Sequence, residues 1–523
     1  MTGRSVADDA LDLSTDVLVV GGGPAGCWAA IAAREAGASV ILVDKGRVGT
    51  SGATAAANTA VIDVAPSGPA RATVIERRLA RGFGLANADW IERMVDETHI
   101  QLGRLPEWGY TFARDDRGVI YRGALRGPDY MQILRRRLLK LGVRLMDHSP
   151  ALHLLVTSDG DVTGAAGVAR DGTDWTVRSA AVVLAAGGCA FMSKALGTYG
   201  LTGDGLLLGA EAGAVLSGME FSGQYGISHD AATVTKNLIF DWATFSDSNG
   251  LVLEGDDIFE LLARRLPQGP VYAVIDKASP SVQEGLRRGQ PNIFLPLDRQ
   301  GIDPFRQRFP VTLRYEGTVR GVGGLMIDAD GAASVRGLFA AGDNASREPV
   351  VGATSGGGGP NSTWAIASGS RAGRSAAKRA AGLGRSALQA RAQIADESGG
   401  DPRTAIATEQ TAAYISVAQA SMFPLERNFS RDAPGLQDSL ARLDDAFRSL
   451  RKDKRSGSDG RGRRREREVA AMLATARWIC ASALERRETR GIHCRRDFPA
   501  CSDVSRRSLE LRGVDEHKVL WAS

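Results

Sequence analysis

The clearest pattern of apolar and polar positions lies near the start of the chain, within residues 15–44. Residues 15–20 form an apolar run rich in β-branched side chains, which is typical of a buried parallel strand. After a glycine-rich turn, residues 29–36 are rich in alanine and predict a helix that ends at Gly37. Residues 39–43 are apolar again and predict a second strand. The stretch therefore predicts a complete strand–helix–strand unit.

The turn between the first strand and the helix has the spacing of a dinucleotide fingerprint. Gly21 permits a tight turn, Gly23 lets the backbone approach a diphosphate, and Gly26 lets the helix pack closely on the strand. The helix N-terminus adds free N–H groups and a partial positive charge for the phosphates. Asp44, at the end of the second strand, lies where a ribose diol can be bound. Together these features predict a dinucleotide site.

Two later segments indicate which dinucleotide is bound. Residues 180–188 form an apolar strand that runs into two glycines, and residues 337–343 form another that ends in Gly342 and Asp343. A nicotinamide-binding domain needs neither segment, whereas a two-part FAD site uses both. We expect the second glycine turn beside the adenosine half, and the acid near the ribityl and diphosphate groups. The order of the three segments predicts FAD.

Length and composition fit a globular protein of several domains. The chain has 523 residues, of which 24% are charged and 43% apolar, so it is neither disordered nor fibrous. No apolar run reaches the roughly 18 residues that span a bilayer, and the first 13 residues lack the apolar core of a secretory signal. Five irregularly spaced cysteines predict neither a disulfide framework nor a metal site. We therefore expect a cytoplasmic protein, either free or attached to a membrane surface through a partner.

The net charge of +5 is concentrated in one segment. Residues 451–467 hold nine Lys and Arg against three Asp and Glu, while the rest of the chain is close to neutral. The run predicts a solvated loop that leads into a charged helix, and a docking surface for an acidic protein is the alternative. Nucleic acid is not favoured as a partner because the run contains no aromatic residue on which bases could stack.

Several further motifs resemble those of the succinate dehydrogenase and fumarate reductase flavoproteins, with L-aspartate oxidase and adenylylsulfate reductase as relatives. The Ser/Thr-rich residues 50–58 resemble the family's loop beside the flavin, and residues 202–205 match its T-G-D-G helix start. Residues 323–324 match the end of its cap. Residues 485–493, followed by 497–499, resemble the E-S-R-G-x-H…D-F-P pattern of its C-terminal domain.

The chain departs from this family at positions that matter for chemistry. Covalent members carry a histidine where this chain has Ala53, so the resemblance implies non-covalent FAD. The family's substrate-binding histidine and proton-donating arginine correspond to Val319 and Phe259 here, and a further arginine is replaced within residues 353–361. The dicarboxylate clamp is therefore missing, which argues against succinate, fumarate and aspartate as substrates.

Four residues are candidates for catalysis or substrate contact. Arg320 lies four residues before Gly324, where the cap should return to the flavin domain, and its guanidinium could fork an anionic group. Tyr225 aligns, without a gap, with the family's active-site histidine. His229 could titrate near neutral pH, and Arg264 could replace the lost proton donor. Each also has a plain alternative as a core or surface side chain.

The fingerprint and the resemblance together imply a set of FAD contacts. Four consecutive glycines at 356–359, before a helix predicted over 364–373, indicate close backbone approach to the flavin ring. The N-terminus of that helix would stabilise the anionic reduced flavin. The predicted contacts are Gly21, Gly23, Pro24, Ala25, Gly26, Asp44, Lys45, Thr50, Ser51, Gly52, Thr54, Asn58, Ala186, Gly187, Asp204, Gly342, Asp343, Asn361 and Ser362.

These inferences predict an α/β fold with a doubly wound FAD-binding domain, an inserted α+β capping domain and a C-terminal helical domain. The FAD-binding domain would take residues 14–215 and 325–385, the cap 216–324 and the helical domain 386–523. The resemblance implies an FAD-dependent oxidoreductase that transfers hydride or electrons between a small anionic substrate and flavin N5. The alternative is the flavoprotein subunit of an adenylylsulfate-reductase-like complex, with an iron–sulfur or other electron-transfer protein as partner.

Overall fold

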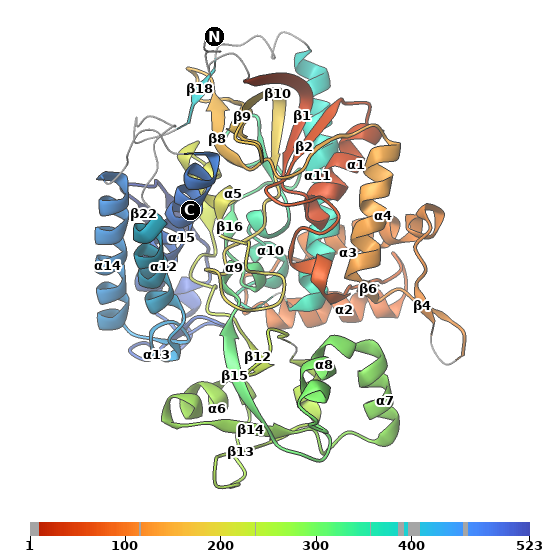
Figure 1. The fold of residues 1–523 in the computed structure, drawn as a ribbon, viewed down its shortest axis with the longest axis vertical. Coiled ribbons are helices and arrows are strands. Elements are labelled where there is room, and N and C mark those ends of the chain that lie inside the picture. The colour runs from red at the N-terminus through yellow and green to blue at the C-terminus, as the bar shows by residue number, and fades with distance from the viewer. Residues whose placement is uncertain are drawn as a thin grey trace, which may run out of the picture.

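The protein is described here by a computed structural model that covers residues 10–114, 117–235, 237–355, 357–384, 392–395, 408–452 and 459–522. Figure 1 shows a large body built around a sheet, a smaller lobe below it, and a group of C-terminal helices at its side. The predicted α/β class, with an inserted cap and a C-terminal helical domain, is confirmed. Among the described residues, no helix is long and apolar enough to cross a membrane.

The sheet of the large body has eight strands in the order β18-β8-β9-β10-β1-β2-β7, with β17 paired to the second half of β10. Its strands are β1 (Leu11–Val20), β2 (Val40–Val43), β7 (Arg144–Met146), β8 (Ala151–Val156), β9 (Val162–Val168), β10 (Asp174–Leu184), β17 (Leu338–Ala340) and β18 (Gln393–Ile394). Strands β17, β10, β1, β2 and β7 run parallel. Strands β8, β9 and the first half of β10 form an antiparallel meander.

Alternate residues of β1 face two different cores. Val17 and Val19 pack with helices α1 (Pro24–Glu35) and α11 (Gly358–Leu383). Leu18 and Val20 pack on the other face with α5 (Asp204–Glu211) and α15 (Gly460–Glu485). Helices therefore cover both faces of the sheet, which explains why residues 17–20 of the strand are apolar without interruption.

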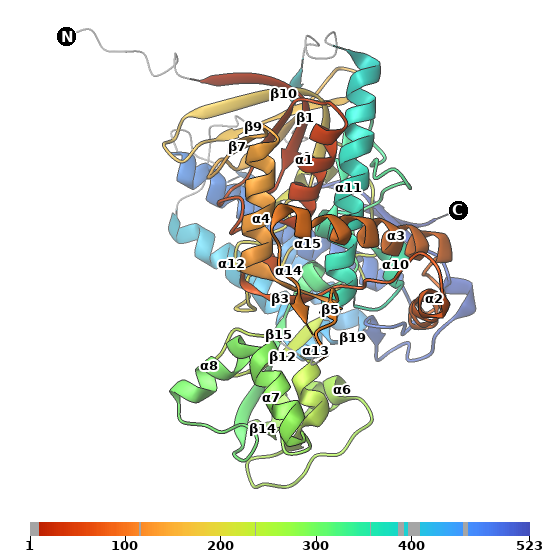
Figure 2. The ribbon, with the colours of Figure 1, turned by 90° about the vertical axis from the view of Figure 1, so that its right-hand side faces the viewer.

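Helices α1 and α11 lie so close together that backbone meets backbone. A Cβ on Gly369 would lie 2.3 Å from the carbonyl oxygen of Ala25, and one on Gly373 would lie 2.1 Å from that of Ala29. The contacts advance in the same direction along both helices, so the helices run parallel, as Figure 2 shows. The N-termini of both helices consequently lie at the same edge of the sheet, beyond the carboxyl ends of its parallel strands.

The smaller lobe is the cap, which has a hydrophobic core of its own around Ile227, Phe240, Leu262, Phe294 and Val311. Its antiparallel sheet has the order β12-β15-β14-β13. The lobe contains β12 (Tyr225–His229), β13 (Thr244–Ser246), β14 (Val271–Val274), β15 (Phe309–Tyr315), α6 (Ile258–Arg265), α7 (Pro280–Gly289) and α8 (Pro291–Arg299). Because β12 pairs with β15, the chain enters and leaves the lobe side by side.

The C-terminal part contains strands as well as helices. Helices α12 (Thr408–Met422), α14 (Ala433–Lys452) and α15 pack together. However, β18 joins the edge of the main sheet, and the hairpin of β21 (Leu509–Arg512) and β22 (Lys518–Trp521) extends a sheet formed by β11 (Leu216–Ser217) and β16 (Gly324–Leu325). Strands β18 and β21 were not predicted from the sequence, and their partners β8 and β11 lie hundreds of residues away along the chain.

The remaining elements connect these parts. They are β3 (Asn58–Ala60), α2 (Pro69–Arg81), α3 (Ala88–Arg104), β4 (Ala113–Arg114), β5 (Ile120–Tyr121), β6 (Ala124–Arg126), α4 (Gly127–Lys140), α9 (Gly317–Arg320), α10 (Glu348–Val351), α13 (Leu425–Asn428), β19 (Ser430–Arg431) and β20 (Cys494–Arg495). Several single-turn helices link them.

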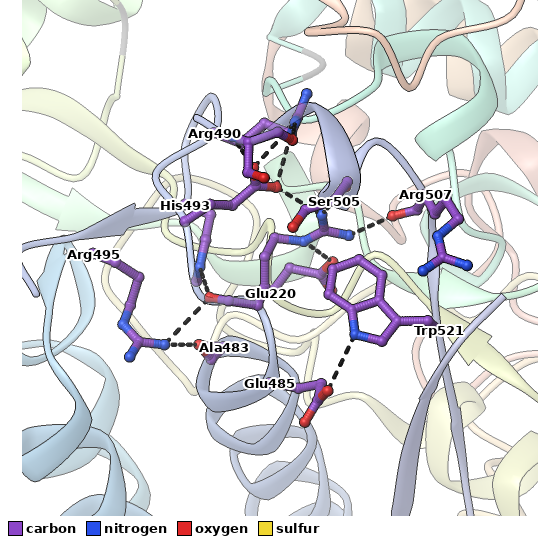
Figure 3. A network of polar contacts seen from close by, with 12 residues as sticks. Glu220, Ala483, Glu485, Arg490, His493, Arg495, Ser505, Arg507 and Trp521 are labelled. Carbon is purple, nitrogen blue, oxygen red and sulfur yellow. Dashed lines mark hydrogen bonds and ion pairs between the residues drawn. The ribbon is translucent and has the colours of Figure 1, made fainter. Parts of the chain in front are cut away.

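Figure 3 shows a network of buried charged side chains that ties the C-terminal part to the body. Arg486 is fully buried, and it donates from Nε to Glu220 at 2.8 Å and from Nη1 to Glu488 at 2.9 Å. Arg490 donates to the same Glu488 carboxylate at 2.7 Å, and His493 Nε2 lies 3.0 Å from the carbonyl oxygen of Arg486. The family-like motif at 485–493 thus links the C-terminal part to Glu220 of the body through buried ion pairs. Removing one partner would leave a buried charge, which costs about 3–5 kcal/mol.

Glu348 lies beside this network. Burial and the nearby carboxylate of Glu220 raise the pKa of Glu348 from 4.5 to about 8. The folded chain therefore keeps this proton up to about pH 8, whereas the unfolded chain loses it near pH 4.5. Unfolding releases a proton between those values, so Glu348 makes the protein less stable as the pH rises across that window.

We predict that Glu348→Gln flattens the pH dependence of stability. The slope contributed by one such group is at most about 1.4 kcal/mol per pH unit. In urea unfolding, the free energy of unfolding of the variant should therefore rise relative to that of the wild type between pH 5 and pH 8. Glu284→Gln, at an exposed surface pair with Arg288, is the control and should follow the wild-type curve. Parallel curves for Glu348→Gln and the wild type would contradict the raised pKa.

A second prediction concerns the contact between α1 and α11. Gly373→Ala places a methyl group against the Ala29 carbonyl and should destabilise the protein by about 1–3 kcal/mol. Gly382→Ala, on the same helix, meets nothing within 4 Å. This control should be neutral or stabilising by up to about 1 kcal/mol, because alanine favours helix. Thermal melting of both variants measures the difference, and equal melting temperatures would show that the helices are not in close contact.

Candidate functional site

A cavity of about 380 Å³ lies where the parallel strands end. It is lined by the last residues of β1 and β2, by residues 185–187 directly after β10, by the first residues of α1 and α11, by most of residues 50–59, and by the end of α9. In open α/β sheets this edge, beyond the carboxyl ends of the strands, is where ligands bind. The fold therefore places the glycine-rich turn, the first acid and the two helix N-termini around one space.

The glycines of the fingerprint have separate tasks. Gly21 has a φ of 110°, and a Cβ there would lie 2.3 Å from the carbonyl oxygen of Ala185. A Cβ on Gly26 would lie 1.8 Å from the carbonyl oxygen of Gly21, so Gly26 serves packing and does not line the cavity. At Gly23 the nearest atom to a Cβ is 3.8 Å away, which leaves room for a ligand to approach the backbone.

Asp44 is buried at the end of β2 and is held in place by three hydrogen bonds. Its carboxylate accepts from the backbone N–H of Gly22 at 2.5 Å and of Gly46 at 2.7 Å, and from the Ser51 hydroxyl at 2.6 Å. These bonds fix the acid to the glycine turn and to the loop after β2. A carboxylate so fixed is well placed to accept from a ribose diol.

Lys45 joins this region to α5. Its Nζ lies 2.5 Å from Asp204 and 2.8 Å from the Thr202 hydroxyl, both in the T-G-D-G motif, and 3.4 Å from Glu468 of α15. Burial acts to lower the pKa of Lys45, but the carboxylates of Asp204 and Glu468 outweigh it and raise that pKa above its ordinary value. Lys45 is therefore a fixed cation in the cavity wall.

Two buried residues that the sequence analysis did not single out hold lining segments of the cavity in place. Asn344 accepts from the backbone N–H of Ala186 at 2.5 Å, which ties the end of β10 to the turn after β17. Arg347 pairs with Asp343 at 2.6 Å and donates to the carbonyl oxygen of Thr318 at 2.7 Å. Arg347 thus holds α9 in position. Asn344 and Arg347 lie within seven positions of Gly342 and Asp343, the Gly-Asp pair that the sequence predicted as part of the FAD site.

Arg320 lines the cavity from the end of α9, whereas Lys45 lines it from just after the end of β2. Its side chain is 21% exposed, and its Nε is 3.4 Å from the carboxylate of Glu316, which is buried and accepts from the Thr235 hydroxyl at 2.6 Å. Asn361 donates to the carbonyl oxygen of Val319 at 3.2 Å, while its side-chain oxygen is buried without a partner among the described residues. An orphaned acceptor beside a cation indicates room for a ligand with both donor and acceptor groups.

Except for Gly26, every predicted FAD contact lines this cavity. These residues are Gly21, Gly23, Pro24, Ala25, Asp44, Lys45, Thr50, Ser51, Gly52, Thr54, Asn58, Ala186, Gly187, Asp204, Gly342, Asp343, Asn361 and Ser362. Helix α11 begins at Gly358, six residues before the predicted start, so that Gly357 and Gly358 line the cavity at its N-terminus.

Three of the four catalytic candidates lie elsewhere. Tyr225 is 1% exposed, donates to the carbonyl oxygen of Met422 at 3.0 Å, and is a packing residue whose pKa is raised by burial. His229 is buried in the cap, where its ring stacks on Phe309 and burial lowers its pKa. Arg264 is exposed on α6. None of these three residues lines the cavity, whereas Arg320 does.

The described part of the basic run is helical: residues 451–452 end α14, and residues 460–467 begin the charged helix α15, as expected. Arg464 and Arg467, with Glu468, line the cavity. Arg463 pairs with Asp174 at 2.5 Å, and Arg467 donates to Glu211 at 2.8 Å, whereas Arg461 is exposed. The expected loop at residues 453–458 lies outside the described part of the chain.

The fold and the cavity define a protein that binds a dinucleotide across a doubly wound sheet under a cap. The family model for an FAD binding domain matches residues 16–223, and that for the C-terminal part of fumarate reductase flavoproteins matches residues 426–516. An L-aspartate oxidase of Mycobacterium bovis is 30% identical over 96% of both chains. A chain of the CoM/CoB fumarate reductase of Methanothermobacter marburgensis is 28% identical over 95% of this chain and 96% of its own length.

Solved structures show the same fold. A quinol fumarate reductase of E. coli has a TM-score of 0.83 at 21% identity and covers 98% of this chain and 97% of its own. Adenylylsulfate reductase of Archaeoglobus fulgidus has a TM-score of 0.77 at 18% identity, with the same two shares. The chain belongs to the flavoprotein family of L-aspartate oxidase, fumarate reductase and succinate dehydrogenase. It is an FAD-dependent oxidoreductase of that family.

We predict that the bound FAD is released intact on denaturation. Among the described residues, no histidine, cysteine or tyrosine lines the cavity, and Ala53 lies where covalent members carry histidine. Acid precipitation of the yellow protein should leave the flavin in the supernatant and a colourless pellet. Flavin fluorescence on the protein band of a denaturing gel would contradict this prediction.

Proposed function

We propose that this oxidoreductase acts on a small anionic substrate, which Arg320 binds at the flavin end of the cavity. The observation that carries the proposal is the position of Arg320. Four cations line the cavity among the described residues, and the other three, Lys45, Arg464 and Arg467, pair with acids of α5 and α15. The proposed FAD contacts are the cavity residues of the fingerprint, the loop at 50–58 and the start of α11.

Each part of the site has a physical task in this proposal. FAD, when bound, supplies the hydride chemistry. Arg320 would orient the substrate by charge-assisted hydrogen bonds, and Glu316 would hold the guanidinium in place. The cap would exclude water, and Asn58 supports this by donating to the carbonyl oxygen of Gly289 in the cap at 2.8 Å.

The charges at this end favour a substrate with one anionic group. Arg320 is accompanied by the buried Glu316, and Asp343 is paired with the buried Arg347, so the four side chains are close to neutral in sum. A dicarboxylate would need further cations, and none lines this end in the described chain. We keep the cytoplasm as the proposed compartment because all five cysteines are unpaired.

The electron-transfer role in a larger complex remains the second candidate. The basic surface expected for a partner is smaller than the sequence suggests, because Arg463 and Arg467 of that run pair with acids within the protein, while Arg461 stays exposed. Gel filtration of the protein from its native cells would reveal such a partner.

The proposal predicts the effect of removing Arg320. Anaerobic bleaching of the flavin would first be screened against singly charged acids, dicarboxylates, amino acids and sulfonucleotides. Arg320→Ala should then lower kcat/KM for the active substrate by roughly 10- to 150-fold, which is the loss of about 1.5–3 kcal/mol for bonds to a charged group. Arg320→Lys should recover part of this loss.

Arg288→Ala, at a 69% exposed arginine of the cap, is the matched control and should react as the wild type does. All variants should retain bound FAD, because Arg320 lies away from the fingerprint. Full turnover by Arg320→Ala on every active substrate would overturn the proposed anion contact.

A further inference from the structure

The two ends of the cavity can be told apart from the chain alone. Asp44 marks the ribose of the adenosine half, because an acid at the end of the second strand of this fold binds that ribose. Lys45, the start of β8 and Leu208 of α5 line the cavity beyond Asp44, and Arg464 and Arg467 of α15 line it with them. The wall around the ADP half is therefore built partly by the C-terminal helix.

The C-terminal side of this wall carries an excess of positive charge. The Glu468 carboxylate has three cations around it: Arg464 at 3.0 Å, Arg465 at 3.3 Å and Lys45 at 3.4 Å. Lys45 also bonds Asp204, so the group of five side chains has a net charge of +1. The bond from Arg464 to Glu468 uses Nε, and its two Nη groups have no partner within the described part of the chain.

We propose that Arg464 binds the ADP half of FAD, so that the C-terminal helix closes the cofactor site that the N-terminal fingerprint opens. A guanidinium can bond phosphate oxygens in pairs and can also lie over an adenine ring. The side chain of Arg464 is 42% exposed, so it can reach a ligand without breaking a buried contact. This role concerns cofactor affinity and is independent of the substrate at the other end.

The packing of α15 gives this contact a fixed position. Arg467 of the same helix binds Glu211 of α5 at 2.8 Å, and the Glu211 side chain is only 1% exposed. Val469 and Leu473 continue the helix into the core that also holds Leu206 of α5. Arg464 is therefore presented by a rigid helix that spans the C-terminal part (Figure 1), and FAD binding and the docking of that part should stabilise each other.

The test measures the affinity of the flavin-free protein for FAD by ultrafiltration and for ADP by calorimetry. Arg464→Ala should raise both dissociation constants about tenfold, the loss of one charge-assisted contact. Arg464→Glu should raise them further, and Arg464→Lys should recover part of the loss. The wild-type dissociation constant for ADP should also rise with salt more steeply than that of Arg464→Ala, because one ion contact is missing in the variant.

Arg461→Ala is the matched control, because Arg461 is exposed on the same helix and does not line the cavity. Its affinities should stay within twofold of the wild type. Circular dichroism and melting of the flavin-free variants establish that each is folded. FAD and ADP affinities within twofold of wild type for both Arg464→Ala and Arg464→Glu would overturn the proposal. Flavin reduction at saturating FAD tests Arg320 separately, so the two proposals can fail independently.

Discussion

The site depends on the close approach of backbone to backbone around the first helix. The turn at Gly21 lies against Ala185, Gly26 lies against Gly21, and Gly369 and Gly373 bring α11 onto α1. Side chains at these positions would push the helices away from the strand ends and from each other. Because they are absent, two parallel helix N-termini and three strand ends surround one cavity, and their N–H groups and dipoles are directed at the same ligand.

The parts of the site that are local in the sequence could be predicted, and the reason is physical. A fingerprint such as Gly21 to Gly26 fixes its own geometry within a single turn, and Asp44 follows one strand later. The acid at Asp343 was found because it ends an apolar strand. By contrast, Lys45 pairs with Glu468 across more than four hundred residues, and no local pattern reports such a contact.

Other features that sequence patterns describe poorly have a similar cause. Tyr225 was matched to a family histidine by alignment, but the alignment does not report its burial: its hydroxyl donates to the Met422 carbonyl and its ring packs against Tyr315. The short strands β18, β21 and β22 carry too few residues for an alternating pattern to be visible. The motif at 485–493 was correctly associated with the family. The structure adds that two of its arginines and Glu488 form buried ion pairs with each other and with Glu220.

The composition of the cavity wall has a consequence for how the enzyme would handle protons. Histidine is the side chain that ordinarily changes charge between pH 5 and pH 8, and none lines the cavity among the described residues. The described wall therefore lacks the side chain that would ordinarily gain or lose a proton in that range. A pH dependence of turnover would then report the reactant, the coenzyme or a buried group outside the wall such as Glu348, whose pKa is about 8.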